Sequence, residues 1–232
     1  MRGKQAGGRN GSVWLRSRRT DREDPITLER IAEAAVALLD AEGIRKLTMR
    51  RLAERLDVVA ASLYWHVDTK DDVIDLAVDA IFGSVAPLEH TADWRVRVAA
   101  IANGWRSVLL HHPWAATASA RQRSPIGPNF LTQMEILQSA LVDAGFTGKR
   151  LPAATWVLYN HVVGSASTQS VLELDEDERR AGQELLSADG EYPTLAANGY
   201  LYDDDWDGNF AAGLEFVLDG LQAQLNAAPP PR

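Results

Sequence analysis

Residues 47–81 read LTMRRLAERLDVVAASLYWHVDTKDDVIDLAVDAI, and this stretch decides the fold of the chain. Its apolar residues recur at the three- and four-residue spacing of amphipathic helices. Thr48 and Thr69 stand where helix N-caps are favoured, and residues 57–59 interrupt the apolar pattern between them. We therefore expect a helix from Thr48, a short helix over 60–66 and a third helix from Thr69. The first two are arranged as in a helix-turn-helix.

Helical periodicity continues on both sides of this stretch. Thr27 is placed to cap an earlier helix that Gly43 ends, because threonine favours N-caps and glycine favours C-caps. Later helices are expected over 93–111, 113–121, 128–144, 152–171 and 207–225. No segment shows the alternation of a strand, so the expected fold class is all-α. Residues 173–191 are acidic and polar, and we expect them to form a long exposed connection.

The composition is that of a globular protein, with 46% hydrophobic and 24% charged residues. Because the chain has no cysteine, it can form neither a disulfide nor a cysteine metal site. No apolar run approaches the roughly 18 residues of a membrane helix, and the basic N-terminus lacks the apolar core of a signal peptide. We expect a cytoplasmic protein with no membrane partner.

Charge is divided unevenly along the chain, whose net charge is −8. Residues 1–70 carry 14 Lys/Arg against 10 Asp/Glu, whereas residues 71–232 carry 10 against 22. A basic first third in an acidic protein indicates that this part meets a polyanion. Residues 1–24 hold seven of the basic side chains, and they form either a solubilising tail or an arm that contacts DNA.

The short helix over 60–66 has few side chains that can anchor it in a core. Only Leu63 and Val67 are obvious anchors, and the other side chains are small, polar or aromatic. Hydroxyl, imidazole and indole groups donate hydrogen bonds to phosphates, and small apolar groups contact thymine methyls. Tyr64 and Trp65 could instead pack against neighbouring helices, and both roles could hold together.

These residues resemble the DNA-binding domain of the TetR family, most closely at LYWHV (63–67) and the following Lys70. The segments APLEHTADW, EILQSALVDAGFT and NFAAGLEFVLDGLQAQL resemble the ligand-binding domain of its tetracycline-repressor-like subgroup. The resemblance implies a helix-turn-helix domain joined by the helix from Thr69 to a larger helical ligand-binding and dimerisation domain. The expected divisions are a basic arm (1–24), the DNA-binding domain (25–72), the ligand-binding domain (73–226) and a Pro-rich tail (227–232).

The resemblance also implies which residues contact DNA, with Arg50 reading the major groove and Lys70 meeting a phosphate. The full expected set is Thr48, Arg50, Ala60, Ala61, Ser62, Tyr64, Trp65, His66 and Lys70. Asp57 replaces the family's usual turn glycine, and Val59 replaces a residue that caps. Alanines stand at 60 and 61 where the subgroup has glutamine and proline, so we expect a different operator sequence that depends more on Arg50 and DNA shape.

The helices after residue 93 carry large side chains with polar groups, which suggest an aromatic cavity for a small-molecule effector. The candidates are Trp105, Trp114, Phe130, Met134, Trp156, Tyr159 and Asn160, although for each one alone a core position is the alternative. The resemblance implies a four-helix interface between two subunits. Its expected residues are Gly164, Gly213, Val217, Gly220 and Gln224.

No metal ion or other cofactor is expected. The subgroup holds a magnesium-bound drug through histidines at places that correspond here to Ala86 and about Ser119, and the histidines of this chain have no metal-ligand spacing. No GxSxG, HExxH, P-loop or paired-carboxylate motif occurs, so an enzyme is not expected. We expect a homodimeric repressor that a small molecule releases from a palindromic DNA operator. The alternative is a helical ligand-binding protein whose operator recognition is lost or weak.

Overall fold

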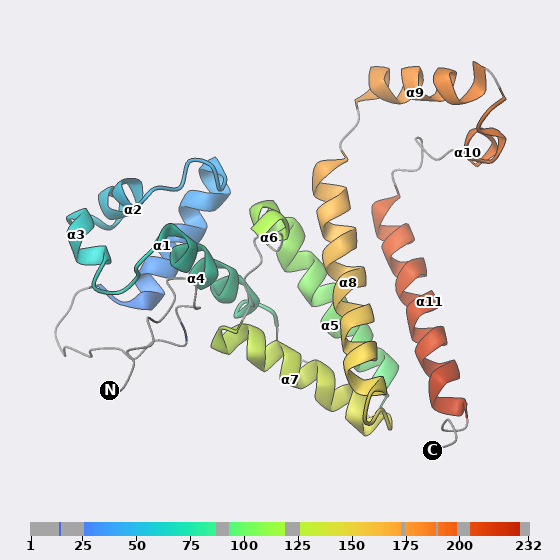
Figure 1. The fold of residues 1–232 in the computed structure, drawn as a ribbon, viewed down its shortest axis with the longest axis horizontal. Helices are drawn as coiled ribbons and strands as arrows, with labels where there is room; N and C mark the ends of the chain where they lie inside the picture. The colour runs from blue at the N-terminus through green and yellow to red at the C-terminus, as the bar shows by residue number, and fades with distance from the viewer. Residues whose placement is uncertain are drawn as a thin grey trace, which may run out of the picture. The chain divides into compact units, whose positions relative to one another are not determined.

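The computed structural model describes residue 14 and residues 26–86, 93–118, 126–172, 175–188, 190–198 and 205–227. Throughout these residues the fold is all-α, as predicted, and they contain no strand (Figure 1). Apart from Trp14 and Ala227, the predicted arm and tail lie outside them. Among the described helices, none is long and apolar enough to cross a membrane.

The chain divides into two compact units, residues 1–140 and 141–232. The first contains α1 (Leu28–Glu42), α2 (Met49–Leu56), α3 (Ala60–Leu63), α4 (Lys70–Phe82), α5 (Trp94–His111), α6 (Pro113–Ala118) and most of α7 (Pro128–Asp143). The second contains α8 (Arg150–Val171), α9 (Glu176–Ala188), α10 (Pro193–Ala197) and α11 (Trp206–Asn226). The first unit thus continues far beyond residue 72, and the domain boundary expected there stays a prediction about function.

Three threonines begin the helices of the N-terminal region, as the sequence predicts. The hydroxyl oxygens of Thr27, Thr48 and Thr69 each accept a hydrogen bond from the backbone N–H three residues later. Asp72 completes a capping box by accepting the N–H of Thr69 at 3.0 Å. These caps satisfy backbone donors that a helix leaves unpaired in its first turn.

α3 is shorter than the predicted helix over 60–66. Its α-helical part ends at Leu63, and residues 64–66 continue in tight turns. Two features of the preceding turn explain the length. Asp57 adopts the left-handed conformation at φ 56°, and Val59 at the N-cap has no side-chain oxygen to accept the first N–H groups. A helix with one cap missing and so few residues gains little from intrahelical hydrogen bonds.

α4 lies at the centre of the first unit, where it packs against α1, α5 and α6 (Figure 1). Its side chains Val73, Leu76 and Ala77 are fully buried. α1 in turn packs on α2, and α2 on α3. α4 is thus connected through α1 to the helices that carry the candidate DNA contacts.

α8 and α11 pack side by side in the second unit (Figure 1). Leu158 and Val162 of α8 and Leu214 and Leu218 of α11 are buried. Gly213 permits this approach, because a Cβ there would lie 2.7 Å from Cε1 of His161. The predicted close contact of another helix at Gly213 is thus made within the chain.

The exposed connection expected over residues 173–191 contains a helix that the sequence analysis did not foresee, because α9 occupies Glu176–Ala188. Asp175 and Glu178 form reciprocal caps: Asp175 Oδ1 accepts the N–H of Glu178 at 2.8 Å, and Glu178 Oε2 accepts that of Asp175 at 3.1 Å. The Asp-x-x-Glu spacing is a capping-box pattern that could have revealed this helix. The polarity of the segment places most of its side chains in solvent, as predicted, without preventing helix formation.

Candidate nucleic-acid interface and effector site

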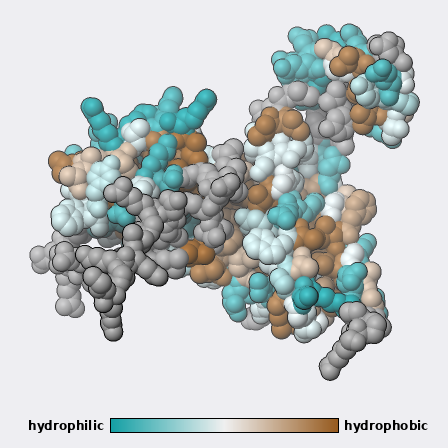
Figure 2. All heavy atoms as spheres, viewed as in Figure 1, coloured by the Kyte–Doolittle hydropathy of each residue, from teal (hydrophilic) through white to brown (hydrophobic). Residues whose placement is uncertain are grey.

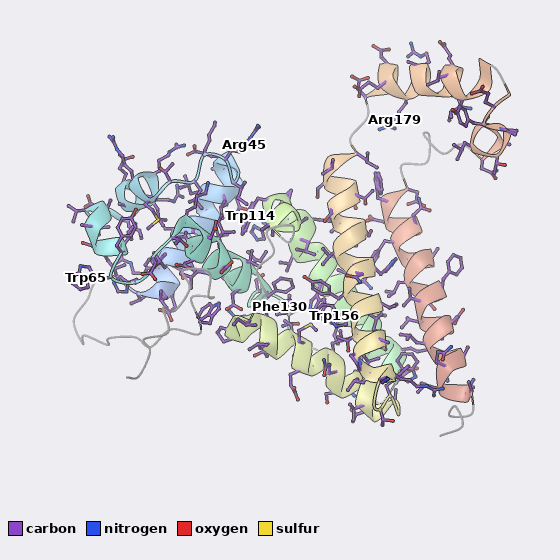
Figure 3. The ribbon with its side chains drawn as sticks, viewed as in Figure 1. Arg45, Trp65, Trp114, Phe130, Trp156 and Arg179 are labelled. Atoms are coloured by element: carbon purple, nitrogen blue, oxygen red, sulfur yellow. The ribbon has the colours of Figure 1, made fainter. Side chains whose placement is uncertain are left out.

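The aromatic side chains after α3 are exposed although its aliphatic anchors are buried. Leu63 and Val67 are fully buried, whereas Tyr64 is half exposed and Trp65 is 80% exposed. Figure 3 shows Trp65 at the outer edge of the α2–α3 pair. An indole that projects into solvent contributes little to a core, so the alternative of core packing is wrong for Trp65. Its N–H is instead available as a donor to a phosphate.

α2 presents its two adjacent arginines in different ways. The Arg51 guanidinium is partly buried and forms an ion pair with Glu42 of α1, which fixes α2 against α1. The Arg50 side chain is 86% exposed, and its Nε donates to Oε1 of Glu54 at 2.8 Å. Thr48 uses its oxygen as the N-cap. Arg50 is thus exposed, whereas its neighbour Arg51 is fixed to α1.

The tip of α3 offers small side chains. Ala61 is exposed, and Ala60, Ser62 and His66 are partly exposed. Val59 just before them is 70% exposed. The two alanines and the valine have no side-chain donor or acceptor, so these three side chains offer a base only apolar contact.

Lys70 makes a contact that was not foreseen from the sequence. Its Nζ donates to the backbone oxygen of Ile44 at 2.8 Å, which ties the first residue of α4 to the turn between α1 and α2. An ammonium group has three donors, so the remaining ones suit a phosphate. Arg45 and Lys46 are exposed in the same turn. Sequence reasoning missed this pair as candidate phosphate contacts, although adjacent basic residues between two capped helices are a visible pattern.

Hydrophilic side chains gather on the first unit where this turn lies (Figures 2 and 3). Of the predicted DNA-contacting residues, Thr48 caps α2, Arg50 stands in α2, Ala60, Ala61 and Ser62 stand in α3, Tyr64, Trp65 and His66 follow α3, and Lys70 begins α4. Their assignment to bases or phosphates stays a prediction.

Two predicted effector contacts, Trp105 and Phe130, lie together in the first unit. With Phe82 of α4 they form an aromatic cluster, with ring centroids 6.0 Å apart for Phe82–Trp105 and 5.2 Å apart for Phe82–Phe130. Trp105 Nε1 donates to Oε1 of buried Gln133 at 3.1 Å. Phe82 was missed as a candidate, although it ends a helix with a clear apolar face. The cluster joins α4 to α5 and α7.

Asp79 makes a second connection between α4 and α7. Its carboxylate is 4% exposed and accepts the backbone N–H groups of Phe130 at 2.9 Å and Asn129 at 3.3 Å. These N–H groups belong to the first turn of α7, where the helix has no internal acceptor for them. Burial raises the pKa of Asp79, and the hydrogen bonds from Phe130 and Asn129 partly oppose this rise. A Cβ at Gly127 would collide with Asp79, so that glycine makes the contact possible.

Trp114 is buried by a contact with α1 rather than placed in open space. Its Nε1 donates to Oδ1 of Asp40 at 2.7 Å, and Nδ1 of His112 lies 2.7 Å from the same oxygen. Trp114 therefore fixes the start of α6 to α1 (Figure 3). Met134 on α7 is partly buried. An effector role for either residue stays a prediction.

The remaining effector candidates belong to the second unit. Trp156, predicted to line a cavity, is 53% exposed, and Asn160 is exposed one turn later. Tyr159 is partly buried, with its ring edge-to-face to Trp156 at 5.5 Å. Trp156, Asn160 and Gly164 recur every four residues, so they share one exposed stripe of α8. This placement favours the subunit interface over the cavity for Trp156 and Asn160.

α11 has a matching exposed stripe that the sequence reasoning missed. Phe216 is 76% exposed, and Gly220, four residues later, has no neighbouring atom within 4 Å of an added Cβ. Gln224 continues the stripe and is exposed, whereas Val217 is partly buried. Phe216 lies outside the apolar face that the sequence shows most clearly. Gly164 and Gly220 have no intrachain contact that would explain a glycine.

Of the two positions where the subgroup has metal-binding histidines, the structure describes Ala86 but not Ser119. Among the residues that the structure describes, no three His, Asp or Glu side chains are grouped to hold a metal ion. Ala86 is exposed.

Two family models match this chain. "Bacterial regulatory proteins, tetR family" matches residues 31–77, and "Tetracyclin repressor-like, C-terminal domain" matches residues 86–225. An HTH-type transcriptional regulator of Saccharopolyspora erythraea is 43% identical over 221 residues, covering 93% of each chain. The HTH-type transcriptional repressor DrrR1 of Streptomyces coeruleorubidus is 32% identical, over 90% of this chain and 83% of its own.

A solved structure is similar over most of the chain. The Streptomyces coelicolor TetR family protein ActR, in complex with (S)-DNPA, superposes with a TM-score of 0.76 at 32% identity, over 87% of this chain and all of that one. The relatives are regulators and repressors of transcription, and the matched regions include both the helix-turn-helix and the helices that follow it. The chain therefore belongs to the TetR family of ligand-responsive, DNA-binding transcriptional regulators.

Proposed function

We propose that this regulator is a homodimeric repressor that binds a palindromic operator through α2 and α3 of each subunit. A small-molecule effector would release it from DNA. The exposure of Val59, Tyr64 and Trp65 around the two buried anchors carries the proposal, because exposed apolar side chains grouped in one short segment mark a contact with a partner. The repressor would act in the cytoplasm, where the bacterial chromosome lies.

The α8 and α11 stripes support the dimer. Trp156, Val157 and Phe216 are large apolar side chains left exposed on neighbouring helices, and the glycines beside them allow close helix approach. A twofold axis through this face would place the same patch against itself. In a dimer bound to successive major grooves, the two recognition helices lie roughly 34–36 Å apart, and the twofold symmetry of the dimer makes the operator palindromic.

The connections of α4 support release by an effector. An effector that displaces Trp105 or Phe130 also displaces Phe82, since these three rings are in contact. Asp79 joins the same helix to the start of α7. Because α4 packs on α1, such a displacement reaches the DNA-binding helices. Coupling of this kind typically changes DNA affinity by about 5- to 150-fold.

Selection of bound duplexes from a randomised DNA pool tests the proposal, with the salt dependence of binding measured on the winning duplex. We expect an enriched palindrome with half-sites about one turn apart, and an affinity that falls steeply as salt rises. Enrichment of no sequence, with only weak binding that salt abolishes, would contradict the proposal. That outcome would favour a ligand-binding protein with lost operator recognition, which the uncapped α3 and its two alanines allow.

A further inference from the structure

The ion pair between Arg50 and Glu54 has an orientation that does little to stabilise its own helix. Arg50 stands in the first turn of α2, which contains no acidic residue. A cation there meets the positive end of the helix dipole, which is unfavourable. The pair also runs from cation to anion along the chain, the less stabilising order for residues four apart. The pair therefore contributes little to the stability of α2.

The neighbouring Arg51 shows what a structural arginine looks like in the same turn. It is partly buried and reaches Glu42 on a different helix, so its ion pair holds two elements together. Arg50 and Glu54 are both exposed and belong to one helix, so their pair joins no elements. What the contact does fix is the direction of a long, flexible side chain.

The atoms used in the pair determine what remains for DNA. Nε of Arg50 donates a hydrogen bond to Oε1 of Glu54 at 2.8 Å, which leaves the two terminal amino groups, Nη1 and Nη2, for another acceptor. Two parallel N–H groups match the O6 and N7 acceptors of guanine. Since Ala60 and Ala61 at the tip of α3 offer no donor, Arg50 carries a large share of base reading.

We propose that Glu54 is a positioning residue for operator recognition, which holds the Arg50 guanidinium with its Nη1–Nη2 edge toward guanine. This inference rests on the proposed operator binding. Glu54 also brings a negative charge near the DNA backbone, which lowers affinity for all sequences. Glu54 thus raises specificity in two ways: it orders the side chain that reads guanine, and it weakens binding that Arg50 does not direct.

Four variants of the full-length chain test this role: Glu54→Ala, Glu54→Gln, Arg50→Ala and the double variant. Each is titrated with the selected operator and with a duplex in which the guanine read by Arg50 is replaced. The ratio of the two dissociation constants measures discrimination. Glu33→Ala, which removes one exposed carboxylate from α1, controls for net charge. Far-UV circular dichroism confirms that every variant is folded.

We expect Glu54→Ala to lower the discrimination ratio about fivefold and to raise affinity for the replaced duplex about threefold. Glu54→Gln keeps an acceptor for Nε but removes the charge. It should therefore raise affinity for the replaced duplex as much as Glu54→Ala does, while its discrimination ratio falls less. In the Arg50→Ala background, removal of Glu54 should leave the ratio unchanged, because no guanidinium remains to be held.

Two results would overturn the inference while leaving the proposed function intact. One is a wild-type protein that discriminates and a Glu54→Ala variant that binds both duplexes more tightly by the same factor. The other is a loss of ratio in Glu54→Ala that persists in the Arg50→Ala background. A wild-type protein that prefers no duplex in the randomised pool would instead overturn the proposed function, and the inference with it.

Discussion

Replacement of Asp79 tests the connection between α4 and α7 most directly. The carboxylate accepts two backbone N–H groups of the first turn of α7 while it is almost completely buried. A buried charge-assisted hydrogen bond contributes about 1.5–3 kcal/mol, and the longer bond to Asn129 adds less. Desolvation of the carboxylate offsets part of this gain, as the raised pKa of Asp79 shows. We therefore expect Asp79→Ala to lower the free energy of unfolding by about 2 kcal/mol.

For a chain of this length, that loss corresponds to a fall in Tm of about 4–8 °C. Urea unfolding followed by far-UV circular dichroism measures the loss of free energy. All variants are compared at one protein concentration, because association stabilises the fold. Glu135→Ala, an exposed carboxylate on the same α7, is the matched control and should change stability by less than about 0.5 kcal/mol. An Asp79→Ala variant as stable as this control would refute the role of Asp79.

The pH dependence of Asp79→Asn gives a second test of the same residue. Because burial raises the pKa of Asp79, the native state keeps this proton at pH values where the unfolded chain has lost it. Relative to Asp79→Asn, the wild type is stabilised most below the unfolded pKa of about 3.8, and this advantage is lost as pH rises through the native pKa. A stability difference that does not change across this range would show that the carboxyl is not desolvated.

Three further predictions concern the dimer and the DNA interface. Phe216→Glu should increase the monomer fraction in sedimentation equilibrium, because it places a charge in the exposed apolar stripe; an unchanged dimer would exclude this face. Trp65→Ala should weaken operator binding about tenfold through loss of one phosphate contact, while Tm, measured in parallel, moves by less than about 2 °C. Lys70→Ala should weaken binding to every sequence alike and reduce the salt slope by about one. It should also cost about 1 kcal/mol of stability, because the bond to Ile44 is lost; a change in base preference would contradict the assignment.

Local features of this chain could be predicted because they depend on residues close in sequence. A threonine cap needs only the N–H three residues away, so Thr27, Thr48 and Thr69 begin their helices as expected. The left-handed turn at Asp57 is likewise local. The unforeseen helix in the exposed connection before α10 also depends on local information, because Asp175 and Glu178 have the spacing of a capping box.

The candidate site depends both on local sequence patterns and on how the helices pack. The positions of Arg50, Trp65 and Lys70 along the chain follow from the helix-turn-helix pattern and the family resemblance. Whether a side chain is exposed or engaged depends on what the other helices bring to it. Trp114 was predicted to face an effector, yet it donates to Asp40, 74 residues earlier. Trp156 was predicted beside a cavity, and the packing of the helices leaves it about half exposed.

The amino-acid sequence thus determined the helix-turn-helix and the starts of the capped helices around it, since hydrophobic periodicity and capping act within a few residues. Only the tertiary structure decided that Asp79 caps the start of α7 and that Phe82 joins Trp105 and Phe130. It also decided that Gly213 accommodates His161 within the chain. These contacts join residues between 23 and 52 positions apart, and no local pattern encodes them, because burial and hydrogen-bond partners arise only when helices pack.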